Sequence, residues 1–189
     1  MSLKHGLLGL LNYGEMTGYE LNKAFEESLS FFWQAQTSQI YRELNKMEEI
    51  GWLTSRIQFQ TDRPNRRIYS ITEAGRAEIL EWLKQDITAS VRPERSALLL
   101  KLFFSANAEK NIGLEMLRAV KAVCEQCLAE MNEVNETMSK YGDVVGSSKE
   151  VMHWAMTADY GRRYYKMTAD WASDCIAMME GFDEEGIDH

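Results

Sequence analysis

The chain has 189 residues, 45% of them hydrophobic and 26% charged, and it is long enough to bury one sizeable core or two small ones. Its net charge of −8 argues against a protein that coats nucleic acid indiscriminately, because that activity needs positive charge spread over the surface. The first 90 residues hold ten basic and twelve acidic side chains and the rest hold eleven and seventeen, so any nucleic-acid site should lie in the first half.

Two helices are predicted at the start of the chain. The first ends near residues 12–14. It carries a stripe of leucines at helical spacing: Leu3, Leu7, Leu10 and Leu11. Thr17 and Glu20 then form a capping-box sequence, in which each side chain bonds the backbone amide of the other. The helix that follows is expected to bury Leu21, Ala24, Phe25 and Leu29. The aromatic residues 31–33 should pack at the corner before the next helix.

A third helix is predicted from Thr37 to Ile50, ended by Gly51. Its apolar residues recur at helical spacing on one side: Ile40, Leu44 and Met47. The opposite side is polar and consists of Ser38, Arg42, Asn45 and Glu49, flanked by Gln39, Tyr41 and Lys46. Hydroxyl, guanidinium and amide groups on one exposed face are the donors and acceptors that read base edges or phosphates in a major groove of DNA.

A β-hairpin is predicted next, because the pattern changes from helical to alternating. Residues 52–60 and 67–71 form its strands, and a polar, turn-rich loop over residues 61–66 joins them. The loop end is basic, with Asp62 opposed to Arg63, Arg66 and Arg67. Such arginines neutralise DNA phosphates and release counterions, although the same composition also suits a solvated turn.

Thr72 is placed to cap a fourth helix, whose expected buried residues are Ile79, Leu80, Leu83 and Ile87. Helix, helix, helix, hairpin and helix within about ninety residues is the winged helix-turn-helix plan, in which the third helix enters the major groove. The sequence therefore predicts a mainly α chain that starts with a winged-helix DNA-binding domain over residues 1–90.

The second half, residues 91–189, is predicted to be an all-helical dimerisation domain with long antiparallel helices. A short apolar helix is expected over residues 93–105 and a long helix over 109–140, followed by a break at 142–148. The long helix carries a heptad-like seam: Leu117, Val120, Cys124, Cys127, Met131, Val134, Met138 and Tyr141.

A last helix over residues 150–180 has two apolar stripes. One should pack on the chain's own long helix: Val151, Trp154, Ala158, Tyr165, Ala172 and Met179. The other is left for a partner, most simply a second copy: Tyr160, Tyr164, Met167, Trp171, Cys175 and Met178. Two copies related by a two-fold axis would read two half-sites of a near-palindrome.

Neither an enzyme nor a cofactor is predicted, because no catalytic, phosphate-binding or dinucleotide motif occurs. Cys124 and Cys127 have a spacing found in metal sites, but His153 is the only nearby further ligand and both thiols lie on the packing seam. We therefore expect no metal. The three cysteines, the lack of a secretory signal and the lack of a long apolar segment predict a reduced, cytoplasmic protein without membrane contact.

A pocket for a small-molecule effector has two candidate positions. The last helix offers aromatic and methionine side chains: Trp154, Tyr160, Tyr164, Met167 and Trp171. The other candidate position is the region of Trp33, Trp52 and Trp82. Helical stripes of this kind also serve as plain core or dimer interface, so both interpretations stay open.

Several motifs resemble the PadR family of transcriptional regulators. They are Thr17-Gly18-Tyr19-Glu20-Leu21, the aromatic residues 31–33, Gln39-Ile40-Tyr41-x-x-Leu44-x-x-Met47-Glu48-x-x-Gly51, and Arg67-x-Tyr69-x-x-Thr72-x-x-Gly75. The second half is similar to the virulence-activator-type domain often fused to that family, best at Tyr160-Gly161 and Trp171. The resemblance implies a cytoplasmic homodimer, usually a repressor, that binds a palindromic operator. It also implies release by a small molecule, such as a phenolic acid or a hydrophobic drug.

By position, the resemblance implies DNA contacts from Tyr19, Gln39, Tyr41 and the basic hairpin residues. The family usually has Ser or Thr at the position of Gln36, as the cap of the third helix, so we expect the cap here to shift to Thr37. The full predicted DNA-contacting set is Tyr19, Thr37, Ser38, Gln39, Tyr41, Arg42, Asn45, Lys46, Arg63, Asn65, Arg66 and Arg67. The alternative is a winged-helix adaptor for protein interactions that binds no DNA, which the acidic net charge would suit.

Overall fold

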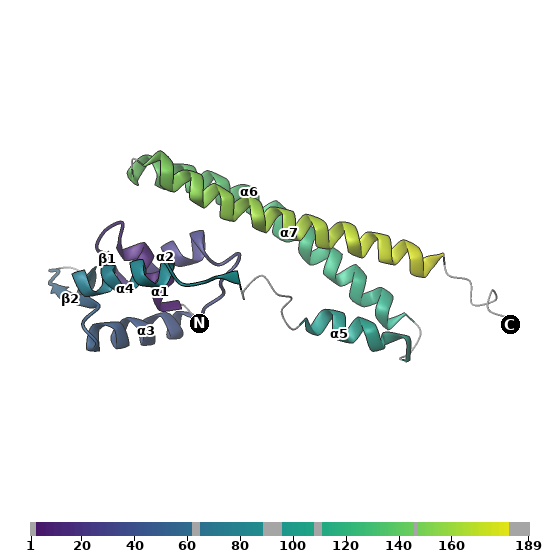
Figure 1. Cartoon of the computed structure of the whole chain (residues 1–189), viewed down its shortest axis with the longest axis horizontal. Helices are drawn as coiled ribbons and strands as arrows, with labels where there is room; N and C mark the ends of the chain where they lie inside the picture. The colour runs from purple at the N-terminus through teal and green to yellow at the C-terminus, as the bar shows by residue number, and fades with distance from the viewer. Residues whose placement is uncertain (1–2, 62–64, 89–95, 108–110, 146, 182–189) are drawn as a thin grey trace. The chain divides into compact units, whose positions relative to one another are not determined.

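The computed structural model describes residues 3–61, 65–88, 96–107, 111–145 and 147–181, and of residues 107 and 132–145 the backbone only. The chain divides into two compact units, Met1–Val91 and Arg92–His189 (Figure 1). None of the described helices has the length and apolar character that a bilayer-spanning helix needs.

The first unit has the winged helix-turn-helix order that the sequence predicts, with one additional strand. Its elements are α1 (Leu3–Leu11), β1 (Met16–Thr17), α2 (Gly18–Ser28), α3 (Thr37–Glu49), β2 (Leu53–Gln58), β3 (Arg66–Ile71) and α4 (Glu73–Leu83). One core joins α1, α2, α3, β2 and β3 through buried side chains: Leu7, Leu8, Leu11, Leu21, Phe25, Ile40, Leu44, Met47, Leu53 and Tyr69. The predicted inner faces of α2 and α3 are therefore confirmed.

Two helix starts follow the predicted capping chemistry. At α2, the Glu20 amide donates to Thr17 Oγ1 at 3.2 Å, and the Thr17 amide donates to Glu20 Oε2 at 2.8 Å. At α4, the Gly75 amide donates to Thr72 Oγ1 at 3.1 Å. These bonds satisfy backbone amides that have no partner within the first turn of a helix.

The start of α3 differs from the prediction, because the cap is Gln36 and not Thr37. Gln36 has extended backbone angles, φ −80° and ψ 147°, and its amide donates to the side-chain oxygen of Gln39 at 2.9 Å. Thr37 is the first helical residue. Because the side chain of Gln39 reaches back over one turn, as that of Glu20 does at α2, Gln36 can serve as the cap residue without a hydroxyl group.

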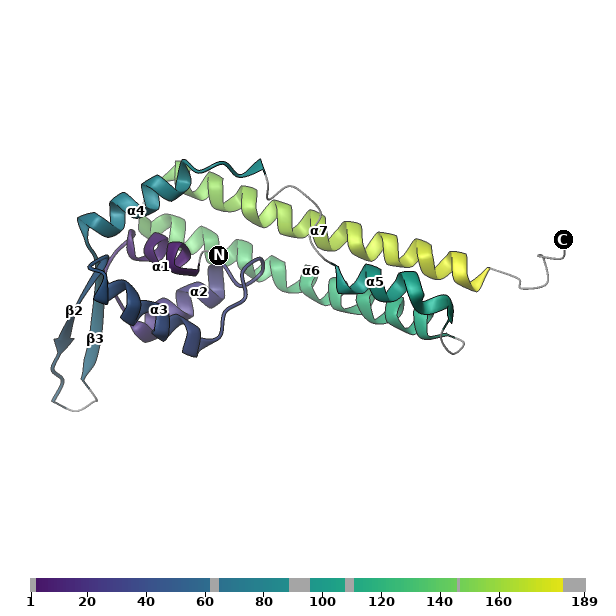
Figure 2. The same ribbon diagram turned by 60° about the horizontal axis from the view of Figure 1, so that its bottom comes forward.

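The three strands form one antiparallel sheet in the order β1-β3-β2. In the hairpin of β2 and β3, Leu53 pairs with Ile71 and Gln58 with Arg66, and Figure 2 shows this hairpin extending away from the helices of its unit. Strand β1 pairs with β3 through Met16 and Tyr69. It was absent from the sequence prediction because two residues are too short to show an alternating pattern.

The buried face predicted for α4 is largely wrong. Ile79 is half-buried against the core, but Leu80 and Leu83 are 58% and 65% exposed, and Ile87 lies exposed beyond the end of the helix. The reason is geometric: α4 is a terminal element that rests on its neighbours with one narrow side. Within the first unit, its remaining apolar side chains face solvent.

The second unit consists of α5 (Ala97–Phe104), a short 3₁₀ helix (Ser105–Asn107), α6 (Ile112–Val145) and α7 (Ser148–Glu180). Helices α6 and α7 lie side by side in both Figure 1 and Figure 2. The predicted break at residues 142–148 is too long, because α6 continues to Val145 and α7 begins at Ser148. Helix α5 begins at Ala97, and Pro93 lies outside the described residues.

The seam between α6 and α7 joins larger side chains to small ones. Leu117, Cys124 and Met131 are buried on α6, and Val120 and Cys127 are half-buried. The facing side of α7 buries small residues, Ala158, Gly161, Ala169 and Ala172, which let the two helices approach closely. The predicted seam residues Val134, Met138 and Tyr141 have side chains outside the described part of the chain.

Candidate nucleic-acid interface

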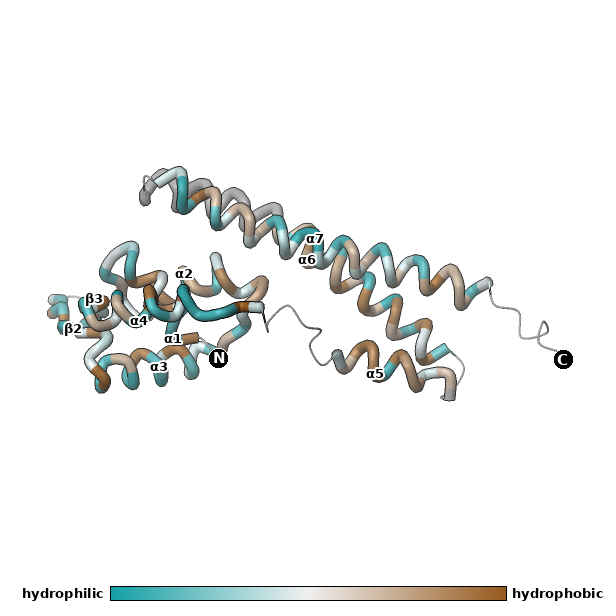
Figure 3. Tube along the Cα trace, viewed as in Figure 1, coloured by the Kyte–Doolittle hydropathy of each residue, from teal (hydrophilic) through white to brown (hydrophobic). Residues whose placement is uncertain are grey.

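Helix α3 presents the polar face that the sequence predicts. Its inner residues, Ile40, Leu44 and Met47, are at most 1% exposed and fix the rotation of the helix about its axis. Figure 3 shows hydrophobic and hydrophilic residues alternating along this helix, as its amphipathic sequence requires. The outer face exposes Thr37, Ser38, Arg42, Asn45 and Lys46. Within the first unit, these side chains of α3 are therefore accessible to another molecule.

Gln39 has a second function that the sequence analysis did not assign. Its side chain is half-buried, and its carboxamide oxygen accepts the Gln36 amide at the helix cap. This leaves the NH2 group for a contact outside the helix. The cap therefore fixes the direction in which that donor points.

Two tyrosines join the start of α2 to α3. Tyr19 is 73% exposed on the first turn of α2, and Tyr41 is 40% exposed on α3. The Tyr41 ring lies over the backbone of Gly18, where a Cβ atom would come within 3.0 Å of the Tyr41 hydroxyl oxygen. The absence of a side chain at residue 18 therefore allows the hydroxyl group of Tyr41 to lie beside the α2 start.

A hollow of about 690 Å³ lies between the first turn of α2, the outer face of α3 and the hairpin. Its lining consists of Thr17, Gly18, Tyr19, Glu20, Tyr41, Asn45, Asn65, Arg66, Arg67 and Tyr69. Six members of the predicted DNA-contacting set are among them, drawn from three separate stretches of the sequence. The other predicted residues of α3 lie outside this hollow on the same helix, and Arg63 is outside the described residues.

Arg67 is held by neighbouring side chains and does not project freely from the hairpin. It forms an ion pair with Glu48 on α3 and donates from Nε to Ser55 Oγ on β2 at 2.8 Å. Its Nη1 lies 3.5 Å from Asn45 Oδ1, and its guanidinium carbon lies 5.2 Å from the centre of the Tyr69 ring. Arg66, by contrast, is exposed at the start of β3. The two adjacent arginines therefore have different surroundings.

Two carboxylates at the interface are held in their ionised form. The Ser70 hydroxyl and the Arg56 guanidinium, which donate to Glu15 at 2.6 and 2.5 Å, lower the pKa of Glu15. The Thr17 backbone amide and hydroxyl lower the pKa of Glu20. Hydrogen bonds donated to a carboxylate favour its charged form. Glu20 therefore places a negative charge in the lining of the hollow, while Glu15 pairs with Arg56 on β2 outside it.

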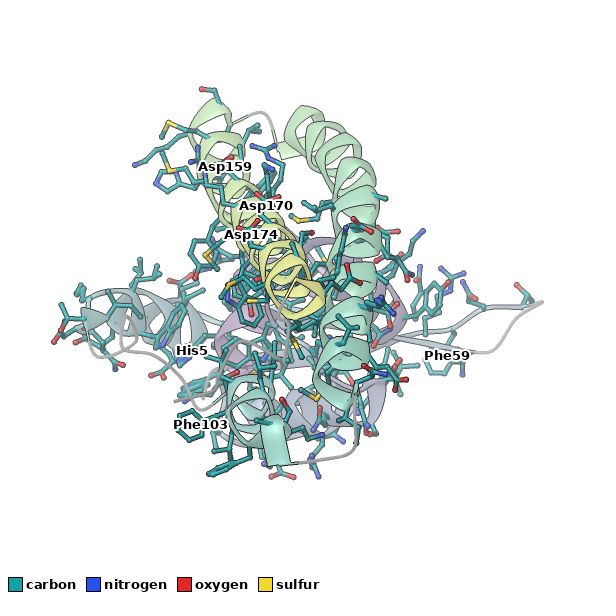
Figure 4. All side chains as sticks on the ribbon, turned by 90° about the vertical axis from the view of Figure 1, so that its right-hand side faces the viewer. His5, Phe59, Phe103, Asp159, Asp170 and Asp174 are labelled. Atoms are coloured by element: carbon teal, nitrogen blue, oxygen red, sulfur yellow. The ribbon has the colours of Figure 1, made fainter. Side chains whose placement is uncertain are left out.

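The sequence analysis missed the functional neighbours of the predicted residues. Glu48 and Ser55 hold Arg67, and Glu15 holds Arg56. Helical spacing does place Glu48 beside Asn45, but its partners come from other segments. The β2–β3 hairpin also exposes apolar side chains, with Phe59, just after β2, 81% exposed and standing out from the ribbon (Figure 4).

The α7 stripe that the sequence predicts to face a partner is largely exposed among the described residues. Tyr160, Tyr164, Met167 and Met178 are between 51% and 74% exposed, and Trp171 and Cys175 are half-buried. Helix α5 also shows apolar side chains to solvent, including Phe103, which points away from its ribbon in Figure 4. The second unit thus has two apolar surfaces with no cover from its own described residues.

The three tryptophans of the first unit take part in packing contacts. The Trp82 ring stacks on the His5 ring with centroids 4.5 Å apart, and Lys4 Nζ lies 4.4 Å from the centre of the Trp52 ring. Trp33 packs against the helical core. In this unit, the faces of these rings that the sequence analysis offered to an effector are therefore at least partly occupied.

The three cysteines are buried or half-buried within the second unit. Cys124, Cys127 and Cys175 are unpaired thiols, and burial raises the pKa of Cys124. Burial, followed by the nearby Cys127, also raises the pKa of Tyr165. Among the described residues, no group of three or more His, Cys, Asp or Glu side chains is arranged to hold a metal ion.

Two family descriptions match the chain. Residues 7–81 match the transcriptional regulator PadR-like family, and residues 94–180 match the virulence activator alpha C-terminal domain. The negative transcriptional regulator PadR of Bacillus subtilis (strain 168) is 30% identical over 152 residues, which are 79% of this chain and 75% of that protein.

Solved structures share the fold over nearly the whole chain. Bacillus subtilis PadR in complex with operator DNA matches with a TM-score of 0.73 and 25% identity, covering 95% of this chain and 99% of that one. The same protein in complex with p-coumaric acid matches at 0.66 and 25%, covering 94% and 98%. The Vibrio cholerae virulence activator AphA matches at 0.73 and 26%, covering 95% and 98%.

Proposed function

This chain belongs to the PadR-like family of DNA-binding transcriptional regulators, and on that premise we propose that it binds a near-palindromic operator as a homodimer and acts as a repressor. In this proposal, residues 1–90 bind DNA and residues 91–189 hold the dimer together in the cytoplasm. Helix α3 enters the major groove, and the β2–β3 hairpin, here called the wing, lies along the neighbouring backbone. Repression is favoured by the similarity to a negative regulator.

The observation that carries the proposal is the single surface formed by α3, the α2 start and the wing. Predicted base-reading residues, Ser38, Arg42 and Asn45, are exposed on α3, while Tyr19 and Arg66 flank them from other segments. Groups on α3 suit base edges, and groups at its sides suit phosphates. The similarity to a regulator solved in complex with operator DNA supports DNA as the ligand of this surface.

The dimer is proposed to form through the exposed stripe of α7, centred on Tyr164 and Met167. A single winged helix makes a small DNA interface, which limits both affinity and discrimination. Two copies joined by a two-fold axis add the contacts of two half-sites, spaced by one helical turn of DNA or a multiple. Contiguous aromatic and methionine side chains are typical of such protein interfaces.

We further propose that a small aromatic or hydrophobic molecule releases the operator. The support is a structure of Bacillus subtilis PadR, a relative by sequence and by fold, in complex with p-coumaric acid. In this chain, Trp154, Tyr160 and Trp171 on α7 provide aromatic surface for such a ligand. A phenolic acid added to the protein–operator complex should then lower the bound fraction.

The test is a selection of genomic DNA fragments by the purified full-length protein, followed by titration of the recovered sites. We expect enrichment of inverted repeats and binding of two protomers for each repeat, measured by sedimentation of the complex. Enrichment of asymmetric sites bound by one protomer would contradict the dimer. No enrichment over unrelated DNA would contradict operator binding and favour the protein-interaction adaptor that the acidic charge also suits.

A further inference from the structure

Glu48 connects α3 to the wing. It lies on the last turn of α3, and one of its carboxylate oxygens accepts from Ser55 Oγ on β2 at 2.6 Å. The other oxygen forms an ion pair with Arg67 on β3. Arg67 in turn donates to Ser55 Oγ at 2.8 Å, which closes a triangle of side chains from three elements. Moving the wing against α3 would break at least two of these bonds.

The same contacts occupy the positive charge of Arg67. Its side chain is 46% exposed and that of Glu48 is 27% exposed, so the pair is partly shielded from water. Asn45 Oδ1 and the Tyr69 ring also lie near the guanidinium, at 3.5 Å from Nη1 and with the ring centre 5.2 Å from its carbon. A carboxylate bonded directly to a guanidinium reduces the attraction that the guanidinium exerts on a DNA phosphate. Arg67 is therefore bonded directly to a carboxylate, whereas the exposed Arg66 interacts with the Glu20 carboxylate through space.

We propose that Glu48 is a positioning residue for DNA recognition, which orients the wing on α3 and withholds the charge of Arg67 from unrelated DNA. This inference rests on the proposed DNA-binding function. An arginine without a carboxylate partner binds any phosphate and so raises affinity for all sequences alike. A held arginine leaves discrimination to the base-reading face of α3, because the complex forms well only where both α3 and the wing fit.

The variant that tests this proposal is Glu48→Gln, because glutamine keeps the shape and the acceptor for Ser55 but loses the charge. The matched control is Glu49→Gln, which makes the same charge change at the next, exposed position of α3. Both variants are titrated with an operator fragment and with unrelated DNA between 50 and 200 mM salt. This comparison removes the general effect of one fewer negative charge.

The expected result for Glu48→Gln is a steeper salt dependence and weaker discrimination. One newly available phosphate contact steepens the slope of log K against log salt by about 0.9, which makes the affinity loss over this salt range about 3.5-fold larger. Affinity for unrelated DNA rises, so the ratio of operator affinity to unrelated-DNA affinity falls relative to Glu49→Gln. In an Arg67→Ala background, Glu48→Gln should leave the slope unchanged, because the charge it releases is absent.

The DNA-free protein gives a second measurement. Amide hydrogen exchange in β2 and β3 should be faster in Glu48→Gln than in Glu49→Gln, since the wing loses the ion pair that is one of its two bonds to residue 48. A Glu48→Gln protein with the slope, discrimination and wing exchange of Glu49→Gln would overturn this inference alone. A wild-type protein that binds no operator would overturn the proposed function and this inference with it.

Discussion

The ring of Tyr41 lies against Gly18, so closely that a methyl group on Gly18 would come within 2.5 Å of the ring carbon Cε1. This contact places a residue of α3 on the first turn of α2, although twenty-three positions separate the two in the sequence. The obstacle is the far end of a side chain and not backbone. A glycine at residue 18 is therefore needed for the position of the Tyr41 ring, and the fold does not depend on it.

Gly18→Ala should displace the Tyr41 ring and weaken operator binding while the protein stays folded. Alanine gains about 0.5–1 kcal/mol over glycine within a helix, which offsets the shift of a side chain that can turn toward solvent. Calorimetric unfolding should show a change below about 1 kcal/mol. Operator affinity in a fluorescence titration should fall to the level of Tyr41→Ala. An affinity equal to wild type would argue that Tyr41 is not a DNA contact.

Gly75→Ala should destabilise the first unit. A Cβ atom at residue 75 would overlap the backbone carbonyl oxygen of Trp52 and lie 2.9 Å from Ile71 Cγ1. Since backbone cannot turn aside, we expect a loss of about 1–3 kcal/mol in the free energy of unfolding, measured in urea. Gly14→Ala is the control, because a Cβ there meets nothing within 4 Å. Equal midpoints for both variants would refute this packing argument.

The free energy of unfolding should depend on pH through the ionisation of Glu20. Its folded pKa is held below the ordinary value of 4.5 by the amide and hydroxyl of Thr17, so its contribution is present above pH 4.5. That contribution is lost as the pH falls through the lowered folded value. Melting temperatures at pH 7 and pH 3 should therefore differ more in wild type than in Glu20→Gln, whose amide can still accept the Thr17 bond. Glu26→Gln, which changes an exposed carboxylate on the same helix, should keep the wild-type difference.

Arg66→Gln should weaken binding to operator and to unrelated DNA by the same factor. Because Arg66 is an exposed cation at the interface, its loss should flatten the slope of log K against log salt by about 0.9. Lys84→Gln, at the residue that ends α4 and pairs with Glu81, makes the same charge change outside the predicted DNA-contacting set and should leave the slope near wild type. Sequence-selective weakening in Arg66→Gln would instead indicate a base contact.

Tyr164→Asp should separate the proposed dimer. The substitution places an unpaired carboxylate on the exposed α7 stripe, where burial against a second copy would cost several kcal/mol. We expect the dissociation constant from sedimentation to rise roughly 100-fold or more. Ala155→Asp adds the same charge on another side of α7 and should leave the dimer intact. If both variants sediment as wild type does, the dimer uses another surface.

The helices of the first unit were predictable because their signals are local. Thr17 and Glu20 lie within one turn of each other, and so do Thr72 and Gly75, so the bonds that start α2 and α4 need no distant partner. The cap of α3 was misplaced at Thr37, because the prediction sought a hydroxyl and the bond comes from Gln39. The buried face of α4 failed for a different reason. Apolar spacing identifies a face but not whether a neighbour covers it, and Leu83 is exposed in its unit.

Sequence patterns alone predict the order of the helices and the hairpin, the helical cores and the polar outer face of α3, because periodicity and capping depend on residues a few positions apart. The folded structure was needed to show which distant side chains meet. It pairs Met16 with Tyr69, gives Tyr41 its place over Gly18, and sets Glu48 against Arg67. The sequence analysis assigned the same function to Arg66 and Arg67, because both are cations next to each other in the hairpin. An ion pair depends on atoms within a few ångströms, and folding, not spacing along the chain, brings those atoms together.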